Sequence, residues 1–185
     1  MSNIAIKGAT TGTGVFTIES PATNTDRTLT LPDEAGTVLT SASPVVAQKG
    51  VPAFSVYQSN SQTLSSNVFT KLTFTSTEFN TEPSYFSSSR FTPLVAGYYA
   101  INAGAVLVST ASAQTLLTVY KNGSTYKLGN LPSNSTNVDG NTIYALVYCN
   151  GTTDYIEIYG RVSVGQATQI GSANTYFQGV LVRAA

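Results

Sequence analysis

Residues able to do catalytic chemistry are scarce in this chain. It contains no histidine, and this absence removes the commonest general base and the commonest zinc ligand. The single cysteine, Cys149, cannot form a disulfide within the chain. We interpret Cys149 as a small buried core residue rather than a nucleophile, because reactive cysteines need a partner that lowers their pKa.

Carboxylates are the remaining candidates for catalysis. Glycoside hydrolysis needs two of them about 5 to 10 Å apart. Glu78 and Glu82 come nearest to a pair, but a spacing of four residues in a loop does not predict that distance. Asp139 and Asp154 are the loop aspartates, and a single aspartate after a turn usually contacts solvent or caps the backbone. We therefore predict no catalytic residue, no metal and no cofactor: the protein is not expected to be an enzyme.

The charge of the chain argues against two kinds of partner. Only 10% of the 185 residues are charged, nine basic and nine acidic, whereas nucleic-acid binding needs a concentrated basic face. No stretch approaches the eighteen apolar residues of a membrane helix, and the first residues lack a secretory-signal pattern. We expect neither nucleic acid nor membrane as a partner, and synthesis in the cytoplasm.

The elements that would position any site are β-strands. No long stretch keeps the apolar period of a helix, and β-branched and aromatic residues dominate. Short strands at regular spacing favour an all-β jelly roll or sandwich. The predicted strands cover residues 53–57, 67–75, 90–95, 97–108, 114–120, 142–149, 154–163 and 175–183.

Turn residues punctuate these strands. Asn122-Gly123 is favoured where both central residues of a hairpin need positive φ, and Asp139-Gly140 and Asn150-Gly151 are interpreted in the same way. Prolines and a glycine in residues 43–52 make a regular element there improbable. The predicted organisation is an N-terminal arm (1–42), a linker (43–52) and a β domain (53–185).

One predicted strand is apolar on both faces. In residues 143–149, alternation places Tyr144, Leu146 and Tyr148 opposite the side chains that face the core. The next strand similarly turns Tyr155 and Tyr159 outward. Tyrosine suits interfaces, so we predict that these five residues form a contact between identical subunits. The alternative is that the tyrosines lie singly on a solvated surface.

The segment RFTPLVAGYYAI, residues 90–101, resembles the FTPxVAGxYxF segment of the complement q subcomponent heads, which belong with the tumour-necrosis-factor-like jelly rolls. Further segments resemble that family in the same order, and together they span about residues 52–183. They are PAFSV at 52–56, VFTKLTF at 68–74, YKNGS at 120–124, GTTDYIEIY at 151–159 and TYFQGVLV at 175–182. The resemblance implies a jelly roll of about ten strands that assembles into a homotrimer.

The N-terminal arm has a resemblance of its own. Roughly residues 12–41, including TIESPATNTDRTLTLPDEAG, look like a segment of bacteriophage virion and tail-fibre proteins that precedes a distal knob. So short an arm cannot bury enough surface alone. We expect it to pack on copies of itself, on the rest of the chain or on another virion protein, as an anchor through Phe16, Ile18, Leu29, Leu31, Val38 and Leu39.

These features predict a virion structural protein on the surface of a phage particle. One hypothesis is a capsid decoration, cement or head-fibre protein that contacts the major capsid protein or another virion protein. The alternative is a tail-fibre adhesin that binds a host-surface glycan or protein. In that case Tyr85, Phe86 and Asn134, in the longest polar loops, are candidate receptor contacts. The short distance from arm to knob favours the first hypothesis.

Overall fold

The computed structural model describes residues 51–108, 114–129 and 138–185, together with scattered positions between 11 and 28. The chain divides into two compact units, residues 1–40 and 41–185. The described residues of the first unit are exposed and contain bends but no strand. All the strands below belong to the second unit.

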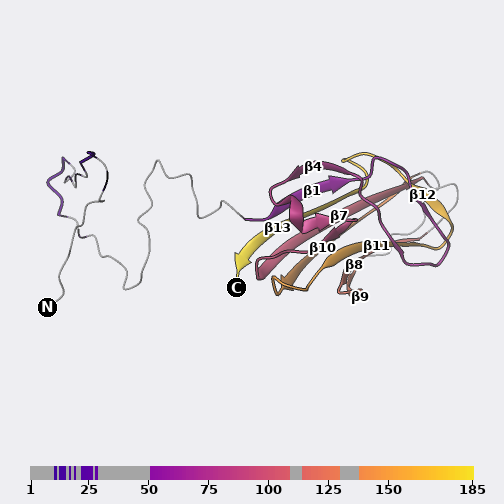
Figure 1. Cartoon of the computed structure of the whole chain (residues 1–185). Helices are drawn as coiled ribbons and strands as arrows, with labels where there is room; N and C mark the ends of the chain where they lie inside the picture. The colour runs from indigo at the N-terminus through magenta and orange to yellow at the C-terminus, as the bar shows by residue number, and fades with distance from the viewer. Residues whose placement is uncertain are drawn as a thin grey trace. The chain divides into compact units, whose positions relative to one another are not determined.

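The first of two sheets in this unit has seven strands. Its path runs β2-β12-β7-β13-β1-β4, and β10 pairs with the other edge of β7 along the full length of both strands (Figure 1). All of these pairings are antiparallel. The strands are β1 (Ala53–Tyr57), β2 (Thr63–Leu64), β4 (Ser76–Asn80), β7 (Gly97–Val108), β10 (Val138–Cys149), β12 (Gln166–Thr168) and β13 (Tyr176–Ala184).

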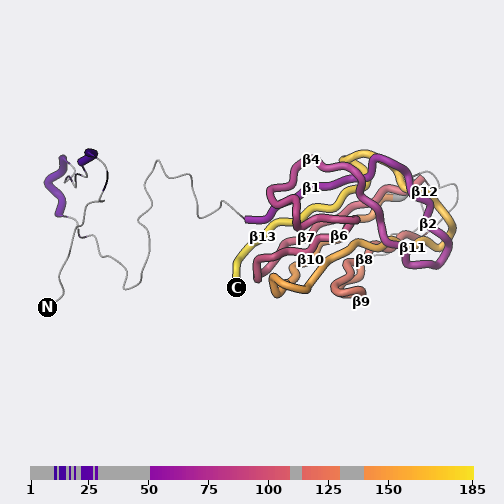
Figure 2. The backbone as a smooth tube through the Cα atoms, in the orientation of Figure 1, coloured from indigo at the N-terminus to yellow at the C-terminus, as the bar shows by residue number. Residues whose placement is uncertain are grey.

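The second sheet has six strands and forms the other layer of a sandwich. Its path runs β5-β6-β11-β8-β9, with β3 also paired to β11, and Figure 2 follows the chain through both layers. A short 3-10 helix, η1 (Pro83–Tyr85), precedes β5. The strands are β3 (Thr70–Lys71), β5 (Phe86–Ser87), β6 (Arg90–Phe91), β8 (Thr115–Lys121), β9 (Ser124–Leu128) and β11 (Ile156–Val162). The predicted all-β jelly-roll class is confirmed.

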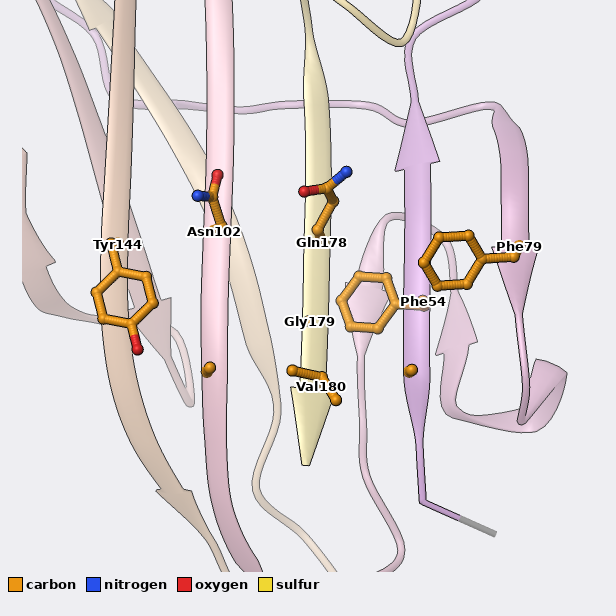
Figure 3. Close-up of a pocket in the computed structure, with 9 residues that line it drawn as sticks. Phe54, Phe79, Asn102, Tyr144, Gln178, Gly179 and Val180 are labelled. Carbon is orange, nitrogen blue, oxygen red and sulfur yellow. The ribbon is translucent and has the colours of Figure 1, made fainter. Parts of the chain in front are cut away.

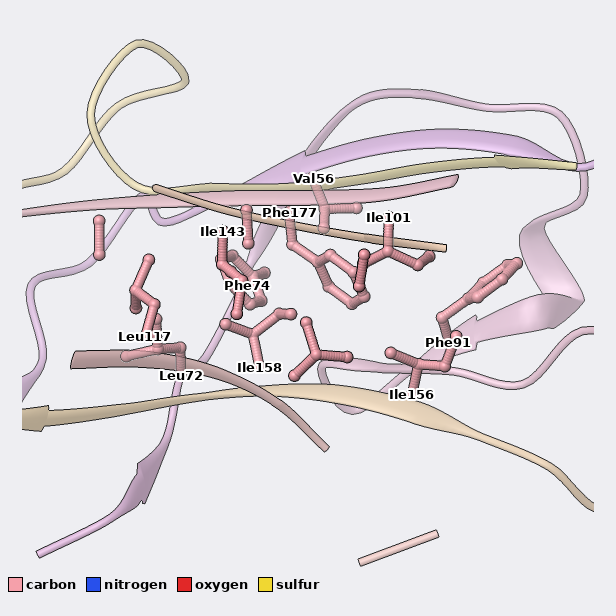
Figure 4. Close-up of a cluster of buried hydrophobic side chains, with 14 of the residues drawn as sticks. Val56, Leu72, Phe74, Phe91, Ile101, Leu117, Ile143, Ile156, Ile158 and Phe177 are labelled. Carbon is pink, nitrogen blue, oxygen red and sulfur yellow. The ribbon is translucent and has the colours of Figure 1, made fainter. Parts of the chain in front are cut away.

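The core lies between the two sheets, where alternate residues of each strand point inward (Figure 4). Phe54 is at its centre, with its ring centroid 4.5 Å from that of Phe91 and 4.9 Å from that of Phe177. These three rings come from β1, β6 and β13 and are almost fully buried. Aromatic packing across the layers therefore joins the two sheets.

The segment that carries the family resemblance lies at one end of this core. The Tyr99 ring packs against Phe91 at 5.4 Å, and its hydroxyl donates to the Val95 carbonyl at 2.7 Å. Gly97 is required by close approach, because a Cβ there would collide with the Arg183 carbonyl oxygen of β13. Phe91, Gly97 and Tyr99 of this segment are therefore all required for packing.

The predicted strands 53–57 and 97–108 are confirmed to the residue. The turn at Asn122-Gly123 is also confirmed, since both residues have positive φ between β8 and β9. The predicted turn at Asp139-Gly140 is wrong: β10 already begins at Val138 and pairs with β7 from there. The long pairing with β7 outweighs the local preference of Asp-Gly for a turn.

The predicted strand 67–75 is also wrong, because the chain changes sheets there. The Leu72 amide donates to Ile158 of the six-stranded sheet, whereas the Thr75 amide donates to Tyr57 of the seven-stranded sheet. Only Thr70–Lys71 forms a strand. A crossing segment keeps apolar residues for the core, and its sequence therefore looks like a strand.

Candidate functional site

The outer face of the seven-stranded sheet carries many exposed apolar side chains. On β10, Tyr144, Leu146 and Tyr148 are 65%, 49% and 42% exposed, whereas the residues between them point into the core. Monomeric soluble proteins rarely expose a large continuous apolar patch. We call this surface the seven-strand face; its exposed apolar residues include Phe79, Tyr98, Val108, Tyr144, Leu146, Tyr148 and Val180.

A cavity of about 450 Å³ lies on this face. Figure 3 shows Tyr144 of β10 at one side and Phe79 of β4 at the other, with β7, β13 and β1 between them. The lining is mostly apolar and consists of Ala53, Phe54, Phe79, Ala100, Asn102, Tyr144, Gln178, Gly179 and Val180. A protruding side chain of a partner could enter this hollow.

A row of polar side chains crosses the same face. Asn102, Gln178 and Ser55 are neighbours across β7, β13 and β1. Gln178 Nε2 donates to Ser55 Oγ at 3.0 Å, and Ser55 Oγ donates to Glu78 Oε2 at 2.6 Å. Hydrogen bonds from Ser55 and Ser172 hold the pKa of Glu78 below its usual value. At the other end of the row, Asn102 Oδ1 is buried and has no hydrogen-bond partner among the described residues.

Apolar exposure continues onto β9. Tyr126 and Leu128 are exposed on this strand, which lies at the edge of the six-stranded sheet. The Tyr126 hydroxyl donates to the Leu146 carbonyl of β10 at 3.1 Å and so links the two sheets at this edge. The apolar surface therefore extends from the seven-strand face to β9.

The structure divides the five predicted interface residues between two surfaces. Tyr144, Leu146 and Tyr148 lie together on β10, whereas Tyr159 lies on the outer surface of the six-stranded sheet. Tyr155 directly precedes β11, and the Arg90 guanidinium lies over its ring, 3.8 Å from the centroid. Both of these tyrosines are half-buried. The role of all five residues in self-association stays a prediction.

The outer surface of the six-stranded sheet, which we call the six-strand face, is built around a buried carboxylate. Glu157 points away from the core, yet it is only 2% exposed because charged and aromatic side chains cover it. Its Oε1 contacts Lys71 Nζ at 2.8 Å and Arg90 Nε at 2.9 Å. Burial alone would raise the pKa of Glu157, but the hydrogen bonds and positive charges of Lys71 and Arg90 prevail and hold it below its usual value.

Aromatic rings surround this carboxylate. The Tyr120 and Tyr159 rings stack with centroids 3.9 Å apart and an interplanar angle of 22°. Phe69 lies 6.2 Å from Tyr120, and the Arg161 guanidinium lies 5.8 Å from the Phe69 centroid. The six-strand face thus comprises Phe69, Lys71, Arg90, Tyr120, Tyr155, Glu157, Tyr159 and Arg161. Sequence alternation predicts that Glu157 faces outward but not the cations that cover it, since Lys71 and Arg90 are distant in the chain.

Two of the three predicted receptor contacts are among the described residues. Tyr85 and Phe86 are half-buried and pack against the core, with the Phe86 ring 5.3 Å from that of Phe54. Asn134 lies outside the described residues. Their contact with a sugar stays a prediction, as does the anchoring role of Phe16, Ile18, Leu29, Leu31, Val38 and Leu39, which also lie outside the described residues.

The residues first considered for catalysis are held in structural contacts. Cys149 is fully buried at the end of β10, and this burial raises its pKa to about 12, so the thiol stays protonated near neutral pH. Asp154 accepts a hydrogen bond from the Asn150 amide at 3.0 Å and pairs with Lys121 at 2.9 Å. It therefore caps the loop between β10 and β11, in line with one of the two roles expected for it.

Neither a metal-binding cluster nor a membrane-spanning helix is present among the described residues. No group of three or more histidine, cysteine, aspartate or glutamate side chains in this part of the chain is arranged to hold a metal ion. No helix among the same residues has the length and apolar character needed to cross a membrane.

Comparisons with known proteins place the fold. No protein-family profile matches the chain, and no curated relative matches it either. Solved structures do match, and the matches to the three structures named below span more than nine-tenths of each of those structures. The globular domain of zebrafish complement 1qA protein is 16% identical, with a TM-score of 0.56 over 73% of this chain and 99% of that chain.

Two further structures have a similar fold. Eiger TNF from S. frugiperda is 9% identical, with a TM-score of 0.55 over 73% of this chain and 93% of that one. PRD1 vertex protein P5 is 19% identical, with a TM-score of 0.52 over 72% of this chain and 99% of that one. The second unit therefore has the jelly-roll fold of complement 1q and TNF domains, in agreement with the sequence resemblance.

Proposed function

We propose that this protein is a structural component of a phage virion: a trimeric capsid decoration, cement or head-fibre protein. In this proposal residues 1–42 fix it to the major capsid protein or another virion protein, and the jelly-roll domain, residues 53–185, projects from the particle. The exposed apolar surface of the seven-strand face carries the proposal, because a single copy would leave it in water.

Three observations support self-association. Tyrosines and branched apolar residues dominate the exposed positions of the seven-strand face, as they do in the centres of protein interfaces. The cavity on this face can receive a side chain of a neighbouring copy. The sequence resemblance to the complement q heads implies three-fold assembly, and PRD1 vertex protein P5 has a similar fold.

The first experiment determines the mass of the full chain in solution. Analytical ultracentrifugation at micromolar concentration is expected to give three times the mass of one 19.4 kDa chain. A monomer at this concentration would contradict the proposal, because the apolar face would then be stable in water without a partner.

The second experiment separates the two virion roles. Phage particles lacking this protein are expected to lose resistance to heat or low salt while adsorbing normally to host cells. Loss of adsorption with unchanged heat resistance would favour the alternative, a tail-fibre adhesin that binds a host-surface glycan or protein. The six-strand face gives that alternative specific support, since it exposes aromatic and cationic side chains together.

A further inference from the structure

The six-strand face carries more positive charge than its carboxylate can balance. Lys71 and Arg90 both contact Glu157, so two cations share one negative charge. Arg161 donates to the Asn67 side-chain oxygen at 2.8 Å and forms no ion pair with a described residue. Lys121, nearby on β8, is paired with Asp154. The uncompensated charge therefore lies along β11, beside the aromatic rings.

The arrangement along β11 is linear. Arg90 contacts the strand at Glu157, Tyr159 follows two residues later, and Arg161 comes two residues after that. Four residues of an extended strand cover about 13 Å, so the two arginines flank the stacked rings of Tyr120 and Tyr159. A guanidinium has five N–H donors, and a single contact with Glu157 or Asn67 leaves donors for a ligand.

This face is poorly suited to contact a second copy of itself. Two such faces would bring arginines and lysines of like charge together, which costs free energy at a desolvated interface. A foreign partner with negative charge would instead gain charge-assisted hydrogen bonds from the arginines. The rings between them offer flat apolar surface that is already fixed by packing, so little conformational entropy is lost on binding.

We propose that the six-strand face binds an acidic glycan, with Arg161 and Arg90 contacting its anionic groups and the rings of Phe69, Tyr120 and Tyr159 contacting its sugar rings. The low total charge of the chain disfavours a nucleic acid, which needs many phosphate contacts for affinity. The assignment does not depend on where the protein lies in a virion, because the face is complete within one chain.

Calorimetric titration of the full chain tests this assignment with three hexasaccharides. Alginate hexasaccharide carries carboxylates, a heparin-derived hexasaccharide carries sulfates, and maltohexaose is neutral. Binding to at least one acidic sugar, weakened as salt is raised, with no binding to maltohexaose, is the expected result. The two acidic sugars also distinguish which anionic group is preferred. Binding to neither of them, or equal binding to maltohexaose, would overturn the proposal.

Variants then locate the site. Arg161→Gln is expected to weaken binding at least tenfold, and Phe69→Ala about fivefold, because both side chains are at the surface and their loss should leave the fold intact. Arg183→Gln is the matched control: it removes the same charge from an exposed position on β13 of the other sheet and should change affinity less than twofold. Equal losses in Arg161→Gln and Arg183→Gln would mean attraction by overall charge and would overturn the site.

Two further measurements keep the outcomes separate. Tighter binding of a single-stranded oligonucleotide or of poly-glutamate than of either acidic sugar would overturn the choice of a glycan. Sedimentation of the same samples reports the trimer independently. A trimer that binds no acidic sugar would overturn this inference alone, whereas a monomer that binds it would overturn the proposed assembly alone.

Discussion

The two outer surfaces of the sandwich differ in how their side chains are satisfied. On the six-strand face, the carboxylate of Glu157 has two cationic partners and the Tyr120 and Tyr159 rings stack on each other. On the seven-strand face, Tyr144 and Leu146 are largely exposed and Asn102 Oδ1 has no hydrogen-bond partner among the described residues. An abundance of tyrosine therefore does not by itself predict an interface; the exposure of Tyr144, at 65%, is the feature on which the predicted interface depends.

Placing a charge on each face in turn tests most directly which of the two faces takes part in self-association. Leu146→Glu is expected to convert the proposed trimer to monomer at micromolar concentration, because a desolvated carboxylate without a partner costs several kcal/mol at each interface. Phe69→Glu places the same charge on the six-strand face and should leave the mass unchanged. Sedimentation velocity measures both variants, and circular dichroism checks that each keeps its β structure.

The reverse result would reassign the faces. If Phe69→Glu dissociated the trimer and Leu146→Glu did not, self-association would involve the six-strand face instead. Tyr155 and Tyr159 would then be the interface residues among the five predicted from the sequence.

A second comparison concerns one glutamate on each sheet. Glu157→Gln is expected to lower the free energy of unfolding by about 2 kcal/mol, because it leaves Lys71 and Arg90 without their shared negative charge. Glu78→Gln on β4 should cost much less than Glu157→Gln, since Glu78 is exposed and makes its bond to Ser55 beside solvent. Denaturant titration of both variants measures the difference. Equal losses would mean that the ion pairs of Glu157 contribute no more than a surface hydrogen bond.

The pH dependence of stability tests the contribution of Glu157 in a second way, with a smaller expected effect. Because the pKa of folded Glu157 lies below the ordinary glutamate value of 4.5, its contribution is complete above that pH and is lost as pH falls below it toward the folded-state pKa. Unfolding measured between pH 6 and 3 should show this loss, and Glu157→Gln should reduce the slope. Part of the slope should remain because of Asp154. Burial would raise the pKa of Asp154, but hydrogen bonds from Asn122 and Lys121 outweigh it and hold the pKa below its usual value.

The sequence predicts the parts of this fold that depend on local pattern. Alternation along 97–108 and 143–149 identifies the two long paired strands and the outward position of Tyr144 and Leu146. The Asn122-Gly123 turn follows from backbone conformation alone. A prediction of this kind needs no knowledge of which strands are neighbours.

What the sequence does not predict depends on neighbours that are distant in the chain. The polar row consists of Ser55, Asn102 and Gln178, which come from three strands. The side chains that cover Glu157 are those of Arg90 and Lys71, which lie 67 and 86 positions earlier in the chain. Period-two alternation in residues 176–181 does indicate that Gln178 and Val180 share one face. That signal could have added Val180 to the predicted interface, but only the strand order places it beside Tyr144 across the cavity.

The smallest expected effect comes from the polar row within the seven-strand face. Asn102 is half-buried and its Oδ1 is already out of water without a donor, so an interface would remove the rest of its amide from water at a cost in free energy. Asn102→Leu, which has a similar volume, should therefore tighten the trimer about fivefold, or by about 1 kcal/mol. Asn102→Asp places a charge at the same position and should loosen the trimer. Sedimentation equilibrium over a dilution series measures both dissociation constants. If Asn102→Leu loosened the trimer instead, the neighbouring copy must hydrogen-bond the exposed part of the Asn102 amide, and the row would be a specific contact between subunits rather than a cost. If neither variant changed the dissociation constant, Asn102 would lie outside the interface and self-association would be confined to β10 and β9.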